Sequence, residues 1–170
     1  MYVPPLDMPL DEVRAELAKL RGPLRIAVQR AKNPFNVGAI IRVAHSFLVR
    51  EIYLIGDEPY YKRASMGMEK YETIRRMPDE AAFLDAIGSV PIVALEKDHA
   101  REGLWDCQLP QECCLVFGSE DLGVAGPILE AASNVVAIPM FGINHSFPVS
   151  VAAGMAMAEW ARRHSSTLYR

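Results

Sequence analysis

The chain contains five short apolar runs, and their spacing constrains its fold more than any other feature. The runs span residues 24–29, 51–56, 91–96, 113–118 and 134–139. Apolar residues in them are nearly continuous rather than alternating with polar ones, which is typical of strands covered by helices on both faces. Helix-like segments lie at 36–47, 78–87, 124–132 and 149–164. This alternation predicts the α/β class, with a mostly parallel sheet flanked by helices and joined by right-handed crossovers.

A further helix is predicted over residues 10–20, before the first apolar run. Acidic residues near its start and a lysine near its end suit the helix dipole. Its Leu17 and Leu20 are expected to pack on the sheet. The length of 170 residues fits one domain, residues 1–170, with a helical extension over residues 1–22.

The net charge of −3 at pH 7 argues against diffuse attraction to nucleic acid, because neutralising phosphates requires clustered Lys and Arg. Local basic segments remain at 60–76 and 161–170, and each alone fits either a solvated charged face or a nucleic-acid contact. No stretch approaches the roughly 18 apolar residues that a membrane span needs. Residues 1–14 also lack the order of a signal peptide, basic and then apolar. We therefore expect a cytoplasmic protein without a membrane segment.

The three cysteines, Cys107, Cys113 and Cys114, are too few and too close together for a disulfide framework. They also lack the paired spacing of a zinc site, and no metal is expected. We interpret Cys113 and Cys114 as core residues at the start of a strand rather than as nucleophiles.

A ligand is expected in the loops that follow the predicted strands, because open parallel sheets bind ligands beyond the carboxyl ends of their strands. The four chemically richest loops are 30–37, 97–103, 118–126 and 140–148. The third begins GSEDLG, which matches neither phosphate-binding glycine motif, and its Glu120 and Asp121 would repel a pyrophosphate. This loop alone is either a ligand-binding turn or a plain strand-to-helix connection. The missing glycine fingerprint weakens a nucleotide-binding protein such as a dehydrogenase as a candidate.

The stretch NPFNVGAIIR, residues 33–42, predicts a turn that leads into a helix. Asn36 is expected to be the N-cap of a helix that begins at Val37, and Gly38 would let another segment approach closely. Arg42 follows one turn later on the helix flank. From this segment alone it is either an ion-paired surface residue or a functional one.

Residues 138–160 combine a proline-flanked loop with a helix dense in small residues. Pro139 and Pro148 stiffen the two flanks of the loop, and His145 is more readily a hydrogen-bonding loop residue than a catalyst. The flat helix face fits either packing on the chain's own sheet or a tight dimer contact. The small or flat residues of this face are Val151, Ala152, Ala153, Gly154, Ala156 and Ala158.

Taken together and in order, these three segments resemble the motifs of the SpoU branch of the SPOUT RNA methyltransferases, the TrmH-like 2'-O-ribose methyltransferases. The first motif, N-x-x-N-x-G-A-I-I-R, is matched by Asn33, Asn36, Gly38 and residues 39–42. The second, an apolar strand ending in F-G-S-E, is matched by residues 115–120. The third, I-P-M followed by a loop and S-[LMF]-N-[VL]-S-V-A, is matched at 138–140, 146–147 and 149–152. The resemblance covers nearly the whole chain after Pro23.

The resemblance implies a C-terminal deep trefoil knot, an exception to the usual rule against knots. It also implies a homodimer and the cofactor S-adenosylmethionine, bound by the loops after Leu95, Gly118 and Ile138. The residues implied to contact the cofactor are Leu95, Gly118, Ile138, Met140, Ser146 and Phe147. Such a pocket would be mostly apolar with a few placed polar groups.

The implied chemistry is methyl transfer to a ribose 2'-hydroxyl, for which the enzyme supplies positioning and help with the hydroxyl proton. The resemblance assigns that help to Arg42, with Asn36 and Glu120 orienting it. Because a guanidinium is a very weak base, two versions stay open. Either Arg42 loses a proton transiently, or it holds a phosphate and stabilises developing negative charge while another group takes the proton.

The sequence departs from the third motif at Pro148, which stands where the family has asparagine. The side-chain hydrogen bonds of the asparagine and one backbone donor are lost together. The leading hypothesis is an RNA 2'-O-ribose methyltransferase, with tRNA favoured over rRNA because minimal members of the family tend to act on tRNA. The alternative is a knotted protein that binds RNA or cofactor with weak or no catalysis. The residues expected to bind RNA are Arg42, Lys62, Arg63, Arg75 and Arg76.

Overall fold

The computed structural model describes the backbone of residues 4–168 and the side chains of residues 4–164. Seven strands form one sheet in the order β3-β2-β1-β6-β4-β7-β5, and every pair of neighbours is parallel. The strands are β1 (Arg25–Gln29), β2 (Glu51–Ile55), β3 (Ile74–Met77), β4 (Ile92–Leu95), β5 (Glu102–Gly103), β6 (Cys114–Phe117) and β7 (Asn134–Ala137). The prediction of an α/β protein with a mostly parallel sheet is confirmed.

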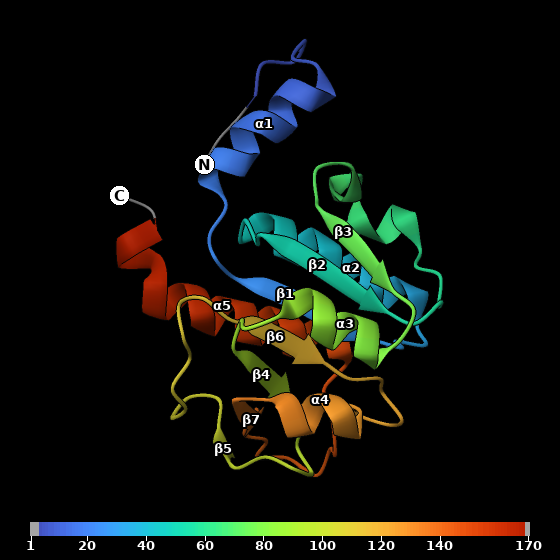
Figure 1. The fold of residues 1–170 in the computed structure, drawn as a ribbon, viewed down its shortest axis with the longest axis vertical. Coiled ribbons are helices and arrows are strands. Elements are labelled where there is room, and N and C mark those ends of the chain that lie inside the picture. Colours follow the sequence, from blue (N-terminus) through green and yellow to red (C-terminus); the bar gives the residue numbers. More distant parts are fainter. Residues whose placement is uncertain (1–3, 169–170) are drawn as a thin grey trace.

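Helices cover both faces of this sheet, as the continuous apolar runs predicted. The α-helices are α1 (Leu10–Leu20), α2 (Pro34–Ser46), α3 (Glu80–Ile87), α4 (Gly126–Ala131) and α5 (Val149–Leu168), and the short 3₁₀ helices are η1 (Lys62–Ser65) and η2 (Met68–Lys70). Figure 1 shows α3 and α4 on the near face of the sheet and α2 and α5 behind it. Ile26 and Leu54 face α2 and α5, whereas Ala27 and Tyr53 face α3 and α4. Each strand therefore buries both of its faces, which leaves its ends for function.

Two strands escaped prediction, and both lie at edges of the sheet. β3 reads Ile-Arg-Arg-Met, so its apolar content is too low for a buried run, and it pairs only with β2. β5 has two residues and pairs only with β7. An edge strand needs one partner and little burial, and charged residues are common there because they discourage further pairing.

The start of α2 differs from the prediction. Asn33, not Asn36, is the N-cap: its side chain accepts a hydrogen bond from the backbone N–H of Phe35, and Pro34 occupies the first turn. Proline suits that position because its missing N–H would have no helical partner there. Asn36 therefore lies inside the helix, and its side chain is available for contacts elsewhere.

The N-terminal helix α1 is confirmed, but Leu17 and Leu20 belong to neither of the two buried clusters on the faces of the sheet. Val13 and Leu17 are buried, whereas Leu20 is 48% exposed. α1 stands away from the sheet at one end of the molecule (Figure 1), where Arg14 donates a hydrogen bond to the carbonyl of Lys70. The helix thus packs near η2 and not flat on the sheet, so its second leucine has no sheet to cover it.

A buried ion cluster fixes the segment between η2 and β3. The Glu72 carboxylate, with no exposed side-chain surface, accepts hydrogen bonds from Arg21 at 2.7 and 3.0 Å and lies 2.7 Å from Nδ1 of His45. The Arg21 guanidinium also donates to the carbonyls of Val49 and Tyr71. These additional hydrogen bonds satisfy the groups that burial would otherwise leave unpaired.

Gly38 is required by the packing of η1 on α2. A Cβ at this position would lie 2.6 Å from the carbonyl oxygen of Tyr61 and 2.7 Å from Cβ of Ala64. The Tyr61 N–H also donates to the carbonyl of Pro34, 3.0 Å away. η1 therefore contacts the first turns of α2 directly, as the glycine predicted.

We expect Gly38→Ala to lower the free energy of unfolding by about 1–3 kcal/mol, because η1 must move off α2 to make room for the methyl group. Urea unfolding followed by circular dichroism measures this change. The matched control is Gly126→Ala in the first turn of α4, where a Cβ meets no atom within 4 Å. It should leave stability unchanged or raise it by up to about 1 kcal/mol. Equal stabilities for the two variants would contradict this account.

Candidate functional site

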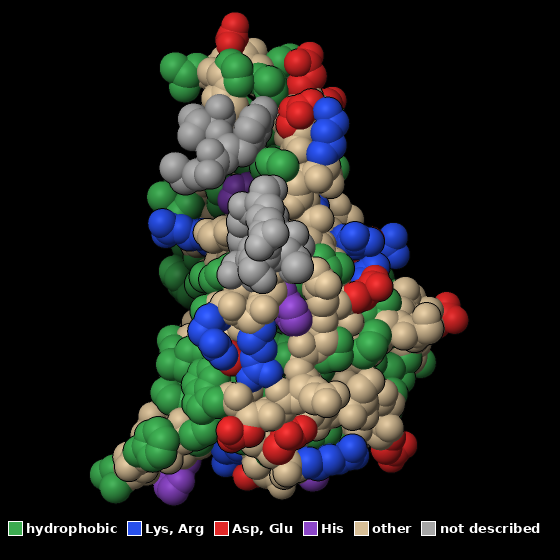
Figure 2. Space-filling model, turned by 90° about the vertical axis from the view of Figure 1, so that its left-hand side faces the viewer, with side chains coloured by type: hydrophobic (Ala, Val, Ile, Leu, Met, Phe, Trp, Pro, Cys, Tyr) green, Lys and Arg blue, Asp and Glu red, His purple; other side chains and the backbone are tan. Residues whose placement is uncertain are grey.

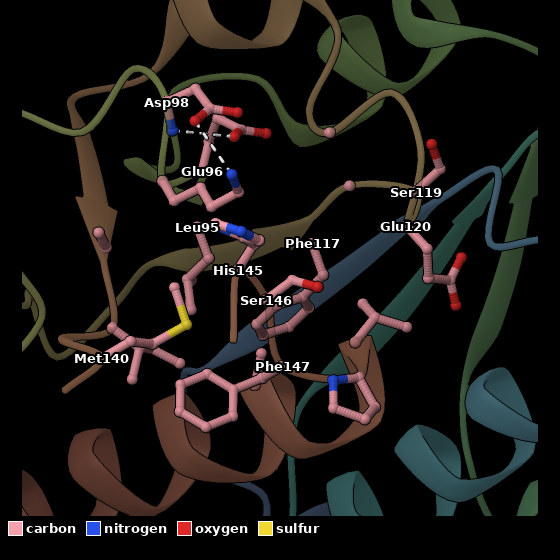
Figure 3. Close-up of a pocket in the computed structure, with 18 of the residues that line it drawn as sticks. Leu95, Glu96, Asp98, Phe117, Ser119, Glu120, Met140, His145, Ser146 and Phe147 are labelled. Carbon is pink, nitrogen blue, oxygen red and sulfur yellow. Dashed lines mark hydrogen bonds and ion pairs between the residues drawn. The ribbon is translucent and has the colours of Figure 1, made fainter. Parts of the chain in front are cut away.

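A cavity of about 670 Å³ lies at the carboxyl ends of β4, β6 and β7. It is bounded by the loops that follow these strands and by the first turn of α5. Figure 3 shows Leu95, Met140 and Phe147 together on one side of it, with Ser119 and Glu120 on the other. This is the place where an open parallel sheet binds ligands.

All six residues expected to contact the cofactor line this cavity, and so does Glu120. Leu95 and Gly118 come from the ends of β4 and β6, and the others from the 138–148 loop that leads to α5. The walls therefore combine apolar side chains with backbone groups of two loops. This composition suits a flat, partly polar ligand.

The loop after β6 is folded back on itself so tightly that only glycine fits at its start. A Cβ on Gly118 would lie 2.1 Å from the carbonyl carbon of Gly123. Ser119 and Gly123 exchange backbone hydrogen bonds at 3.1 and 3.0 Å, and Gly123 has a φ of +66°. The backbone of this turn thus forms a cradle at the wall of the cavity.

Glu96, which also lines the cavity, holds the same loop in place, and no sequence motif pointed to it. Its carboxylate accepts a hydrogen bond from the N–H of Val124 at 2.9 Å and another from Asp98 at 3.2 Å. Gln29 acts in the same way at the end of β1, where its side chain accepts from the N–H of Ala125. The only sequence signal for these two residues was a polar side chain at the carboxyl end of a strand. Their hydrogen-bond partners could not be predicted, because they lie 28 residues from Glu96 and 96 residues from Gln29.

The Asn36 carboxamide joins the three motif segments. Its nitrogen donates to Glu120 at 2.7 Å, and its oxygen accepts from the Ser150 hydroxyl at 2.8 Å. An ion pair between Lys32 and Asp121 connects the same two loops, and the hydrogen bond from Lys32 to Asp121 raises the pKa of that lysine. α2, the loop after β6 and the start of α5 are therefore held together at the rim of the cavity.

Arg42 does not line the cavity, and its side chain makes no hydrogen bond or ion pair with Glu120. It is exposed on α2, and its guanidinium makes no hydrogen bond or ion pair with any residue that the structure describes. Arg42 is therefore a surface arginine without an ion pair to any described residue. Its donors are available to a ligand that approaches from outside the cavity.

The five residues expected to bind RNA do not form one surface. Arg76 pairs in register with Leu54, which faces α2, whereas Arg75 pairs with Tyr53, which faces α3. Arg75 also lies 3.3 Å from the carboxylate of Glu51. Arg42, Lys62, Arg63 and Arg76 thus belong to the α2 side, and Arg75 belongs to the opposite side.

The second basic segment, 161–170, is largely neutralised where it is described. Arg162 and Arg163 both bind Glu159, and the hydrogen bond from Arg162 is the main reason that the pKa of Glu159 falls to about 2. Arg163 also donates to the carbonyls of Leu104 and Trp105. On the face shown in Figure 2, acidic and basic side chains occur in small mixed groups rather than as one basic surface. The side chains of 165–170 lie outside the described residues.

Pro148 and His145 both line the cavity. The Pro148 carbonyl accepts the N–H groups of Val151 and Ala152, so the proline serves as the residue before the first turn of α5. The proline therefore leaves the start of this helix intact. His145 is exposed, and Figure 3 shows its ring beside Leu95.

The three cysteines are buried and form no disulfide. Burial raises the pKa of Cys113 to about 12, and it also raises the pKa values of Cys107 and Cys114. Within residues 4–168, no group of three or more His, Cys, Asp and Glu side chains could hold a metal ion. In the same part of the chain, no helix is both long and apolar enough to cross a membrane.

The fold and site define an α/β protein with a ligand cavity at the carboxyl edge of a parallel sheet, bordered by three sequence motifs held together by one asparagine. Residues 23–158 match the SpoU rRNA Methylase family, and the chain belongs to this family. Members of the family take their methyl group from S-adenosylmethionine.

Curated relatives support this assignment. A tRNA (guanosine(18)-2'-O)-methyltransferase of Thermus thermophilus is 29% identical over 87% of this chain and 79% of its own length. A 23S rRNA (guanosine-2'-O-)-methyltransferase of a Burkholderia species is 30% identical over 86% of this chain and 62% of its own length. The chain spans 53% of a third relative, an uncharacterized tRNA/rRNA methyltransferase of Synechocystis.

Among solved structures, the TrmH/SpoU tRNA modifying enzyme of A. aeolicus superposes with a TM-score of 0.80. It is 24% identical, and the match covers 92% of this chain and 85% of that one. The fold is therefore that of the SPOUT methyltransferases. The trefoil knot itself remains a prediction.

We expect Gly118→Ala to abolish measurable binding of S-adenosylmethionine, because its Cβ would overlap the backbone of Gly123 and push the 119–123 turn out of place. Isothermal titration calorimetry measures the affinity. Gly126→Ala, eight residues on and with open space around its Cβ, is the matched control and should bind as the natural chain does. Unchanged affinity in Gly118→Ala would show that this turn does not form the cofactor cradle.

Proposed function

We propose that the chain is an S-adenosylmethionine-dependent RNA 2'-O-ribose methyltransferase, with tRNA as the favoured substrate. The observation that carries this proposal is the Asn36 carboxamide, which bonds Glu120 and Ser150 at the rim of the cavity. It brings the three motif segments of a ribose methyltransferase into one site, although they are separated by 84 and 114 residues.

The cavity fits the cofactor. The glycine cradle at Gly118 and Gly123 brings bare backbone to the wall, and Leu95, Met140 and Phe147 supply apolar surface for an adenine ring. Gly118, Ile138 and Ser146 would offer backbone groups to the polar edges of the nucleoside. When bound, S-adenosylmethionine supplies a methyl group on a positively charged sulfur, which is a leaving group that needs no metal.

Asn36 and Glu120 would orient the groups that meet the ribose. The Glu120 carboxylate accepts from Asn36 and keeps further acceptor positions for a hydroxyl proton or for a guanidinium. The Arg42 guanidinium would bind a phosphate of the substrate and stabilise negative charge that develops on the 2'-oxygen. Whether Arg42 also takes the proton is a separate alternative, and it requires an unusually basic form of the side chain.

The lengths covered by two matches support tRNA as the substrate, although the relatives include rRNA enzymes as well. The chain covers 79% of the Thermus thermophilus tRNA methyltransferase but 62% of the Burkholderia rRNA methyltransferase. A solved structure described as showing the 2-OH methylation of C/U34 on tRNA is 25% identical, and 99% of its chain is covered. Family members of a size similar to this chain thus include tRNA enzymes.

We also propose that the chain works as a homodimer that uses the outer side of α5. Ala153, Ala156 and Trp160 are buried against the sheet, whereas Val151 and Ala158 are exposed. Gly154 lies between these two on the outer side of the helix, and a Cβ added to it would meet no atom within 4 Å. The small residues of α5 therefore lie on two sides of the helix. One side packs on the sheet, and the other leaves room for a helix of a second subunit.

We expect Arg42→Ala to reduce transfer of a tritiated methyl group to bulk tRNA by at least about 100-fold, because one charged donor aimed at developing negative charge supplies about 3 kcal/mol of transition-state stabilisation. Affinity for S-adenosylmethionine, measured by calorimetry, should stay the same, since Arg42 does not line the cavity. The control is Arg50→Ala, an exposed arginine just before β2 at the opposite edge of the sheet.

Full methyl transfer by Arg42→Ala would contradict a role of this arginine in catalysis. Cofactor binding by the natural chain with no label in any RNA would instead favour the second candidate, a binding protein without catalysis. The observation behind that candidate is Pro148, which lines the cavity in place of a hydrogen-bonding asparagine. Pro148→Asn should then restore transfer.

We expect Gly154→Arg or Ala158→Arg to convert a dimer into a monomer, because a long charged side chain separates two closely packed helices. Sedimentation velocity measures the mass of the particle. Glu130→Arg, on the exposed side of α4 across the sheet, is the control and should leave the mass unchanged. A monomeric natural chain, or a dimer that tolerates both arginines, would contradict this interface.

A further inference from the structure

Two aromatic rings lie in the open beside Asn36. Phe35 is 57% exposed and Tyr61 is 37% exposed, and their ring centroids are 4.4 Å apart with a tilt of 38°. Phe35 immediately precedes Asn36, whose side chain closes the rim of the cavity. A large apolar surface of this kind costs free energy in water, and covering it favours the binding of a ligand.

The pair is held rigidly by its backbone. The Tyr61 N–H donates to the carbonyl of Pro34, and the missing side chain of Gly38 allows the Tyr61 carbonyl to rest against α2. Phe35 lies in the first turn of the same helix, and its N–H is bound by the cap residue Asn33. Both rings are therefore placed before any ligand arrives, which lowers the entropy cost of binding.

Three exposed cations lie on the two elements that contain or adjoin the rings. Lys62 and Arg63 directly follow Tyr61 and are exposed. Arg42 lies seven residues after Phe35, which is within about 20° of the same helix face and about 10 Å further along it. None of these three cations has a side-chain partner among the residues that the structure describes. Positive charge around a stacked ring is the combination that binds single-stranded nucleic acid.

We propose that Phe35 and Tyr61 form a stacking platform for an unpaired base of the RNA substrate, next to the nucleotide whose ribose is methylated. This inference rests on the proposed function and adds the form of RNA that is recognised. A base in a duplex is stacked on its neighbours and cannot lie on a protein ring, so the platform selects a loop or a splayed nucleotide. Arg42, Lys62 and Arg63 hold the phosphates on either side.

The test compares two forms of one RNA by fluorescence anisotropy. The probes are a labelled single strand of mixed sequence and the same strand annealed to its complement. The Phe35→Leu, Tyr61→Leu double variant keeps apolar volume but removes both rings. We expect it to bind the single strand about tenfold more weakly or worse and the duplex unchanged, since stacking on one ring is worth about 1–3 kcal/mol per base.

Two variants serve as controls. Phe35→Trp retains a ring and should bind the single strand within about twofold of the natural chain. Trp105→Leu removes a different exposed ring, 44% exposed in the loop after β5, and should also have no effect. Calorimetry with S-adenosylmethionine checks that the double variant is folded, because the cavity does not include either ring.

Unchanged affinity of the double variant for the single strand would overturn the platform, as would an equal loss for single strand and duplex. A change in sedimentation of the double variant would also overturn it, because the rings would then belong to a subunit contact. These readouts need no methyl transfer. Ring-dependent RNA binding without transfer by the natural chain would refute the proposed function alone, and transfer with ring-independent binding would refute this inference alone.

Discussion

The site depends on the two hydrogen bonds made by the Asn36 side chain. This side chain offers one donor and one acceptor, and the structure uses both, for Glu120 and for Ser150. A carboxamide suits this position because its nitrogen can donate to the carboxylate while its oxygen, a separate atom, accepts from the hydroxyl. The asparagine can do this because Asn33 and Pro34 have already started the helix, which leaves Asn36 inside it with its amide free.

Close backbone approach is the second constraint, and glycine provides it at two places. Gly118 lets the turn after β6 fold onto Gly123, which shapes the wall of the cavity, and Gly38 lets η1 rest on α2. The first contact places backbone groups at the site proposed for the cofactor. The second brings Tyr61 to Phe35 and so decides what lies outside the rim. Both glycines act by the absence of a side chain, so their effect depends on what lies opposite them in the fold.

Sequence patterns predicted the parts of the fold that depend on local burial. Apolar runs predicted β1, β2, β4, β6 and β7, because these strands are covered on both faces. They missed β3, whose two arginines point to opposite faces of an edge strand, and they could not show that Arg75 and Arg76 are separated by the sheet. The sequence predicted Asn36 as the N-cap of α2, whereas Asn33 is the N-cap. Both are good capping residues, and only Pro34 between them favours Asn33. The residues around the cavity came from a family resemblance, and all line it, but Glu96 and Gln29 act through backbone partners that no local pattern reveals.

The distribution of partners among the cations explains how an acidic chain could attract RNA. Arg21, Arg25 and Arg30 are bound to carboxylates within the fold, as is Arg75, so their charge is already neutralised locally. Arg42, Lys62 and Arg63 are exposed and make no such pair among the described residues. A phosphate that reaches these three replaces water and counterions rather than a carboxylate, and release of counterions is favourable. A net charge of −3 therefore does not exclude binding at this place, because Arg42, Lys62 and Arg63 have no carboxylate partner among the described residues. If the proposed platform binds RNA, these three cations and the two exposed rings would give the chain a local preference for single strands without making its whole surface attractive to nucleic acid.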